Sequence, residues 1–192
     1  MTGIRGVPEK ETGWLGRLAY RFSRHRFGEV PEPVRVTAHH RNLLLGTGAM
    51  ELSLDRCELV DDRLKKLAEM KVALVVGCEF CIDIGSMLGK DLGIMDDQIR
   101  ALPRFRESAA FTPLEKMVLE YAVGMSMTPA SVTNDLFGAL HEHFDEAQMV
   151  ELTAAIAWEN HRARFNHALG VSSQGFSEGS LCLLPEVPEE AR

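Results

Sequence analysis

Apolar residues recur three or four positions apart along most of this chain, which is the spacing that one buried helix face requires. No stretch alternates between β-branched and polar residues, as a half-buried strand would. The spacing predicts helices at residues 34–45, at residues 53–76 with a start at Ser53 or Asp55, and at residues 78–89 and 95–102. The pattern therefore predicts an all-α fold.

Polar side chains predict where several helices begin and end. Residues 112–115, Thr-Pro-Leu-Glu, have the sequence of a capping box with proline in the first turn, and residues 145–148, Asp-Glu-Ala-Gln, have another. Residues 128–129, Thr-Pro, repeat the first arrangement and predict a further helix start. The last helix is expected to run over residues 146–169, and Gly77 is expected to interrupt the helical pattern before residue 78.

The beginning of the chain differs from the rest in charge. Residues 1–41 carry eight Lys and Arg against four Asp and Glu side chains, a net charge of +4, whereas the whole chain has a net charge of −7. Between residues 14 and 24, apolar side chains fall on one helical face and Arg17, Arg21 and Arg24 on another. This predicts an amphipathic helix that packs on the domain or on a second subunit, with binding to a membrane surface as the alternative. Residues 28–33, with one Gly and two Pro, predict an extended connection.

These patterns divide the chain into three parts. Residues 1–40 form a basic helical arm and linker, residues 41–170 one multi-helix domain, and residues 171–192 an irregular tail that frays from about Pro185. The negative net charge argues against binding of nucleic acid. No apolar run reaches about 18 residues, so we expect no membrane span, and without a secretory signal we expect a cytoplasmic protein.

Two of the four cysteines, Cys78 and Cys81, lie three residues apart where a helix is predicted to begin. A chain of 192 residues can bury a core without disulfides, so this pair is expected to serve chemistry. Free N–H groups and the helix dipole at a helix start favour thiolate over thiol, and two thiols on one face can form a disulfide. Two inert buried cysteines are one alternative. A zinc site completed by histidines of residues 39–40 or 141–143 is another, although no metal or cofactor is expected.

The run RLKKLAEMKVALVVGCEFCIDIGSMLGKDLG at residues 63–93 resembles the core of the carboxymuconolactone decarboxylase superfamily, on its AhpD-like alkylhydroperoxidase branch. The likeness is specific in GCEFCID and extends more loosely over residues 40–170, as far as ARFNHALG. It implies an all-helical subunit that assembles into homo-oligomers, and a CxxC pair that reduces peroxides or exchanges with a dithiol donor protein. By this resemblance Cys81 would be the peroxide-attacking thiol and Cys78 the resolving thiol.

Two positions depart from the peroxidase motif of that family. The motif has Glu twelve residues before the first cysteine and His four residues after the second, a relay that withdraws the proton from the attacking thiol; here these residues are Lys66 and Gly85. Because a thiol does not attack, activation must come from elsewhere. The charge of Lys66 is one candidate, unless Lys66 instead pairs with Asp62 or Glu69 on its own helix.

Other side chains are weaker candidates for assisting the thiols. Ser86 lies on the same predicted helix and carries a hydroxyl, and His161 and His167 lie on the last helix, from which either could reach the pair. Asp83 follows Cys78 by five residues, roughly 140° around the helix, and is expected to face elsewhere.

Three functions remain open from the sequence. The first is a thiol-disulfide oxidoreductase that reduces peroxides, slowly because the relay is absent, with a peroxide or disulfide as substrate and a dithiol protein as electron donor. The second is an enzyme like carboxymuconolactone decarboxylase, in which His and acidic groups transfer protons. The third is a non-enzymatic helical oligomer whose cysteine pair senses redox state.

Overall fold

The computed structural model describes residues 3–177, and every regular element in this part of the chain is a helix, as predicted. The predicted fraying from Pro185 lies outside the described residues. No helix of residues 3–177 is both long and apolar enough to cross a membrane. The elements are α1 (Trp14–Phe27), α2 (Glu32–Thr37), α3 (Arg41–Leu54), α4 (Asp62–Val76), α5 (Glu79–Asp91), α6 (Asp96–Ala101), the 3₁₀ helix η1 (Leu102–Arg104), α7 (Pro113–Ser126), α8 (Asn134–His141) and α9 (Glu146–Ala168).

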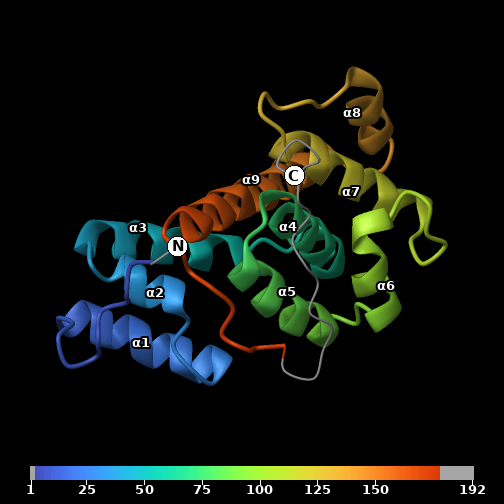
Figure 1. Ribbon diagram of the computed structural model, residues 1–192. Helices are drawn as coiled ribbons and strands as arrows, with labels where there is room; N and C mark the ends of the chain where they lie inside the picture. The colour runs from blue at the N-terminus through green and yellow to red at the C-terminus, as the bar shows by residue number, and fades with distance from the viewer. Residues whose placement is uncertain (1–2, 178–192) are drawn as a thin grey trace.

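Helix α4 is the centre of the molecule and packs against α5, α7 and α9 (Figure 1). Its last ten residues, Leu67–Val76, are apolar at nearly every position, which is the composition of a helix buried on more than one side. Leu67 and Leu74 belong to a core cluster shared with α5, whereas Val72 belongs to a second cluster shared with α7 and α9. Helices α1, α2 and α3 lie together on the opposite side from α6 and α7 (Figure 1).

The N-terminal amphipathic helix is confirmed as α1, but the connection after it is not extended as predicted. Helix α2 begins at Glu32, since Pro31 serves as its N-cap and Pro33 lies in its first turn, where proline is tolerated. The single helix predicted at residues 34–45 is also wrong. The chain breaks between α2 and α3, where the ring of His40 caps α3 by accepting a hydrogen bond from the N–H of Leu43.

The long helix predicted at residues 53–76, with a start at Ser53 or Asp55, begins later than expected. Ser53 lies in the last turn of α3, and α4 begins at Asp62 with Asp61 as its N-cap. The loop before it is held from outside: the carboxylate of Glu151 on α9 accepts hydrogen bonds from the N–H groups of Leu59 and Val60, at 3.0 and 3.1 Å. Leu59 fits the apolar spacing of a helix, but its backbone N–H is bound to Glu151 on α9. The helix predicted from the spacing therefore does not form there.

The capping boxes at residues 112–115 and 145–148 are confirmed at the starts of α7 and α9. Gly77 interrupts the helical pattern as predicted: it ends α4, in the left-handed conformation with φ 78°. The helix start at residues 128–129 is wrong. Helix α8 begins at Asn134, and Thr133 is its N-cap because its side chain accepts a hydrogen bond from the N–H of Leu136.

Candidate functional site

Cys78 and Cys81 are joined by a disulfide at the start of α5, with their Cα atoms 5.3 Å apart. The left-handed Gly77 turns the chain sharply between α4 and α5, so that Cys78 becomes the N-cap of α5. Its Sγ accepts a hydrogen bond from the backbone N–H of Cys81 at 3.1 Å. In the reduced protein, the same hydrogen bond would favour a thiolate on Cys78.

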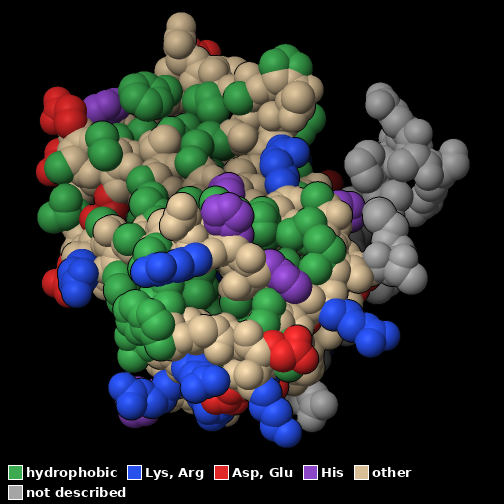
Figure 2. Space-filling model, turned by 90° about the vertical axis from the view of Figure 1, so that its left-hand side faces the viewer, with side chains coloured by type: hydrophobic (Ala, Val, Ile, Leu, Met, Phe, Trp, Pro, Cys, Tyr) green, Lys and Arg blue, Asp and Glu red, His purple; other side chains and the backbone are tan. Residues whose placement is uncertain are grey.

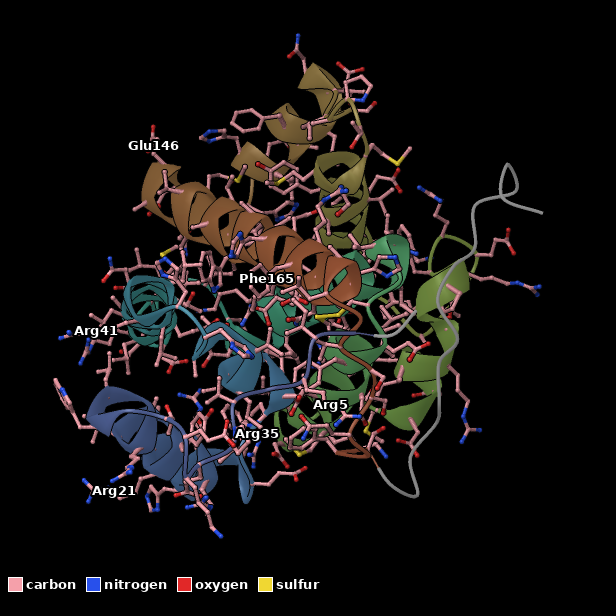
Figure 3. The ribbon with its side chains drawn as sticks, turned by 60° about the vertical axis from the view of Figure 1, so that its left-hand side comes forward. Arg5, Arg21, Arg35, Arg41, Glu146 and Phe165 are labelled. Carbon is pink, nitrogen blue, oxygen red and sulfur yellow. A yellow bond between two sulfur atoms is a disulfide. The ribbon has the colours of Figure 1, made fainter. Side chains whose placement is uncertain are left out.

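Cys81 lines a cavity of about 1080 Å³, and Cys78 is not part of its wall. One wall consists of α4, α5 and α9, and the other of α1, α2 and α3; Figure 3 shows α1 at Arg21, α2 at Arg35 and α3 at Arg41 on one side of α9. Apolar side chains from both walls make up most of the lining, including Leu18, Phe22, Leu43, Phe80, Leu88 and Phe165. The size and lining suit an organic molecule larger than hydrogen peroxide.

Helix α9 brings one polar side chain to the sulfur. The amide nitrogen of Asn166, which is buried, donates a hydrogen bond to Cys81 Sγ at 3.6 Å. In Figure 3 the disulfide lies beside α9 close to Phe165, the neighbour of Asn166. The next residue, His167, faces the other end of the motif, where its Nδ1 lies 3.1 Å from the carbonyl oxygen of Gly77. Nothing in the sequence motif singled out Asn166, because the contact joins helices 85 residues apart.

The two relay positions hold neither the Glu nor the His of the family motif. The Lys66 ammonium pairs with Glu69, which was the alternative considered for it on helix spacing. Gly85 lies one turn after Cys81, and a Cβ atom added there would come within 3.3 Å of Met70 Cγ. A histidine at residue 85 would therefore need Met70 to move.

The auxiliary candidates make other contacts. The Ser86 hydroxyl donates to the carbonyl oxygen of Ile82, 2.7 Å away on its own helix. His161 lines the cavity and stacks between Trp158 and Phe165, with ring centroids 4.6 and 6.0 Å apart. Neither side chain makes a hydrogen bond to the cysteine pair.

A cluster of charged side chains lies in the same cavity wall, and the sequence did not predict it as a unit. The guanidinium of Arg162 on α9 bridges Glu69 of α4 at 3.0 Å and Glu51 of α3 at 3.2 Å. It also pairs with Glu159, one turn earlier on α9, at 2.8 Å. Lys66 completes the cluster through Glu69. These ion pairs join three helices across the cavity.

The two buried carboxyl groups of this cluster differ in protonation. Burial raises the pKa of Glu159 to about 7, because Arg162 offsets the loss of hydration only in part and Glu69 adds repulsion. For Glu69, burial acts in the same direction, but Lys66 and Arg162 together outweigh it and hold its pKa below the ordinary value. Near neutral pH, the Glu69 carboxyl is therefore ionised, whereas the Glu159 carboxyl is partly protonated.

Asp83, which was expected to face elsewhere than the thiols, does not line the cavity beside Cys81, and it holds the chain that follows α9. Its carboxylate accepts hydrogen bonds of 2.7 to 3.0 Å from two hydroxyls and four backbone N–H groups of residues 173–177. Burial alone would raise its pKa, but the hydrogen bonds from Ser177 and its neighbours lower it. Phe176 packs edge-on against Phe80 within the CxxC motif, with centroids 5.9 Å apart. Residues 171–177 thus lack regular structure, as predicted, but are fixed to α5.

Across residues 3–177, no three side chains among His, Cys, Asp and Glu come together in an arrangement that could hold a metal ion. The free cysteine in this range, Cys57, also lines the cavity, and its Sγ donates to the carbonyl oxygen of Ser53 at 3.4 Å.

The sequence model of the carboxymuconolactone decarboxylase family matches residues 58–123, from the loop before α4 to the last turn of α7. The protein YnjA of Escherichia coli (strain K12) is 34% identical over 164 residues, which are 85% of this chain and 87% of YnjA.

Two solved structures share the fold at low sequence identity. The debrominase Bmp8 is 19% identical, with a TM-score of 0.80 over 92% of this chain and 94% of Bmp8. A peroxidase-related protein from Ralstonia eutropha JMP134, described as an alkylhydroperoxidase AhpD core, is 16% identical, with a TM-score of 0.75 over 95% of this chain and 93% of that protein.

Proposed function

Since the chain belongs to the carboxymuconolactone decarboxylase family, we propose that Cys78 and Cys81 are the active dithiol of an AhpD-like oxidoreductase that reduces peroxides. One observation carries this proposal: the two sulfurs are close enough to form a disulfide, and of the two only Cys81 faces the cavity. The exposure of Cys81 to the cavity supports Cys81 as the attacking thiol and Cys78 as the resolving thiol.

The cycle begins with the reduced pair. The Cys81 thiolate attacks one peroxide oxygen, the S–O bond forms as the O–O bond breaks, and the leaving oxygen takes up the proton that Cys81 released. The Cys78 thiol then attacks the Cys81 sulfur, so that the S–S bond forms, the S–O bond breaks and water leaves. The dithiol has lost two electrons and the peroxide has become an alcohol and water. A dithiol donor restores the pair by exchange and becomes a disulfide itself.

The charges around the cavity favour an uncharged substrate. The Lys and Arg side chains in the cavity wall are Arg26, Lys65, Lys66 and Arg162, and each of them is already paired with a carboxylate. An anionic substrate would have to displace one of these carboxylates, whereas an apolar hydroperoxide would only displace water from an apolar lining. The same argument weighs against a lactone carboxylate, the substrate type expected for the decarboxylase alternative.

The test compares single cysteine variants of the reduced protein. We expect the wild type to consume an apolar hydroperoxide such as cumene hydroperoxide with a dithiol as donor. Cys81→Ser should lose this turnover, and Cys78→Ser should react once and stop at the sulfenic acid, which dimedone traps. Cys57→Ser is the matched control, since Cys57 lines the same cavity but is not part of the pair. A wild-type protein whose thiols survive exposure to peroxide would contradict the proposal and favour a non-catalytic role.

A second candidate is the reductive removal of halogen from an apolar ring, favoured by the large apolar cavity beside Cys81 and by the fold shared with the debrominase Bmp8. A cysteine-to-alanine variant of Bmp8 was crystallised in complex with 2,3,4-tribromopyrrole. In such a reaction the dithiol would be oxidised to the disulfide and supply two electrons. The C–Br bond would break, a C–H bond would form with one of the two thiol protons, and bromide would leave with the other proton. Release of bromide from a brominated pyrrole, in parallel with the peroxide assay, separates the two candidates.

We further propose that the protein works as a homo-oligomer in the reducing cytoplasm, where a dithiol is maintained. Figure 2 shows the face of α1 and α3, on which hydrophobic side chains lie in several groups. Trp14, Leu18, Phe22 and Leu43 are about half exposed or more, which is unusual for a monomer's surface. Light scattering of the purified protein should give a mass of at least two chains.

A further inference from the structure

The proposed reaction requires a group that holds Cys81 as a thiolate, and the relay of the family does not supply one here. Lys66 is engaged by Glu69, and Gly85 has no side chain. The inference below rests on the proposed function only in taking Cys81 as the reacting sulfur.

The helix start does not provide this stabilisation directly. Cys78 is the N-cap residue, and its sulfur takes the hydrogen bond from the N–H of Cys81. The N–H of Ile82 is bound to the carbonyl oxygen of Cys78, 3.0 Å away. The Cys81 sulfur thus lies beside the first turn of α5, and its hydrogen-bond donor has to come from another helix.

That donor is on α9. We propose that the side-chain amide of Asn166 stabilises the Cys81 thiolate and so takes over the activating role of the missing acid and base. Its nitrogen lies 3.6 Å from Cys81 Sγ, within reach of a hydrogen bond to sulfur. Because it touches the reacting atom, Asn166 is a catalytic residue in the proposed reaction.

The position of Asn166 is fixed by its surroundings. Its side chain is buried, and its backbone carbonyl accepts a hydrogen bond from the N–H of Val171 at 3.0 Å, just after α9 ends. One turn earlier, Ala163 is fully buried in the same core cluster as both cysteines, which keeps α9 close to α5. A donor held in this way needs no rearrangement when negative charge forms on sulfur.

A neutral amide acts differently from a base. It takes no proton from Cys81 and does not titrate, so it lowers the pKa of the thiol by favouring the charged form alone. The helices that pack against α5 also carry titratable and charged groups near the cavity or the motif. These are Asp62, Lys65, Lys66 and Glu69 on α4 and Glu151, Glu159, His161, Arg162 and His167 on α9. Of these, Lys66, Glu69, Glu159 and Arg162 compensate one another within the charged cluster.

The opposite orientation of the amide makes the opposite prediction. If the oxygen of Asn166 faced the sulfur, it would accept a hydrogen bond from the thiol and raise its pKa. Removal of the amide would then lower the pKa of Cys81 instead of raising it, so one measurement distinguishes the two orientations.

The experiment measures the pKa of Cys81 without depending on turnover. In a Cys78→Ser background, the rate of alkylation by iodoacetamide is followed against pH at the peptide that contains Cys81, by mass spectrometry. Asn166→Leu, which is close in shape but has no donor, should raise the pKa of Cys81 by about one unit, a tenfold smaller thiolate fraction below that pKa. Asn166→Ala serves as a second variant if the leucine disturbs folding, and circular dichroism checks both.

Asn160 provides the matched control. It lies on the same helix and is also partly buried, but its amide donates to the Ser126 hydroxyl and the Ile156 carbonyl oxygen, each at 3.1 Å. Asn160→Leu should leave the pKa of Cys81 unchanged. An unchanged or lower pKa in folded Asn166 variants would overturn the inference, even if the wild type reduces peroxides. A raised pKa in a protein that reduces no peroxide would support the inference and contradict the proposed function instead.

Discussion

The two walls of the cavity differ in how far their helices are buried. Helix α4, in the wall behind the cysteines, buries eight of its fifteen residues, whereas α3, in the facing wall, has no buried residue among its fourteen. The first wall holds the disulfide, Asn166 and the relay positions within or beside a densely packed core. The second wall lines the same cavity with leucines that are about half exposed. The reaction site thus lies on the buried wall, whereas the facing wall, which also shapes the cavity, is mostly exposed.

Polar contacts attach the outer wall to the inner one. Glu51 of α3 accepts hydrogen bonds from Trp158 Nε1 at 2.8 Å and from Arg162 at 3.2 Å, both on α9. Within the outer wall, Asp55, just after α3, pairs with Arg26 of α1. These contacts are partly exposed, and such pairs contribute less to stability than apolar burial does. Four substitutions measure this difference between the walls, from the largest expected effect to the smallest.

Removal of packing from the inner wall should have the largest effect. Leu67 in α4 is fully buried at the junction with α5, so Leu67→Ala should lower the free energy of unfolding by about 2–5 kcal/mol. Urea denaturation followed by circular dichroism measures this loss. A loss below about 1 kcal/mol would show that the inner wall is less tightly packed than the structure indicates.

The second-largest loss of stability is expected when the contact between α5 and residues 173–177 is weakened. Asp83→Asn replaces a carboxylate that accepts six hydrogen bonds with an amide that cannot accept them all, so we expect a loss of about 2 kcal/mol. Hydrogen exchange should become faster at the amides of residues 174–177.

The pH dependence of the wild type gives an independent check on Asp83. Its pKa is lowered in the folded protein, so its contribution is complete above the unfolded value of about 4 and is lost as the pH falls through the folded pKa. The Asn variant should lack this part of the acid sensitivity.

The charged cluster between the walls should have a smaller effect on stability. Its pH dependence should be opposite to that of Asp83, because stability should fall as the pH rises. The pKa of Glu159 is raised to about 7 in the folded protein, so the folded state binds more protons than the unfolded state between about pH 4.5 and 7. Stability should therefore fall by about 1–2 kcal/mol as the pH rises from 5 to 7. Glu159→Gln, which stays neutral, should remove this slope. The groups that face Glu159 are Arg162, Glu69, Lys66 and Glu51, and they remain in the variant.

Removal of packing from the outer wall should have the smallest effect on stability. Leu43 in α3 is 52% exposed, so Leu43→Ala should change the free energy of unfolding by less than about 0.5 kcal/mol. Because Leu43 lines the cavity, the same substitution should raise KM for an apolar hydroperoxide and leave kcat nearly unchanged. An effect on stability as large as that of Leu67→Ala would remove the distinction between the two walls.

Local signals in the sequence were sufficient where a helix end depends on neighbouring residues. The capping boxes at residues 112–115 and 145–148 and the interruption at Gly77 were predicted because the hydrogen bonds that define them lie within one turn. The start of α4 was not, since the loop before it is held by Glu151, more than 90 residues away. The division of residues 34–45 into two helices was also missed, because an N-cap histidine is a weak signal.

The amino-acid sequence by itself determined the helical class, the family likeness and the position of the cysteine pair at a helix start. It also showed that Lys66 and Gly85 replace the expected relay. Only the tertiary structure decided that Cys81 faces a cavity, that Asn166 touches its sulfur and that Glu159 shares a buried cluster with Glu69. The reason is physical: periodicity and capping are local interactions within one helix, whereas a cavity and its polar contacts arise from the packing of α9 against helices far away in the chain.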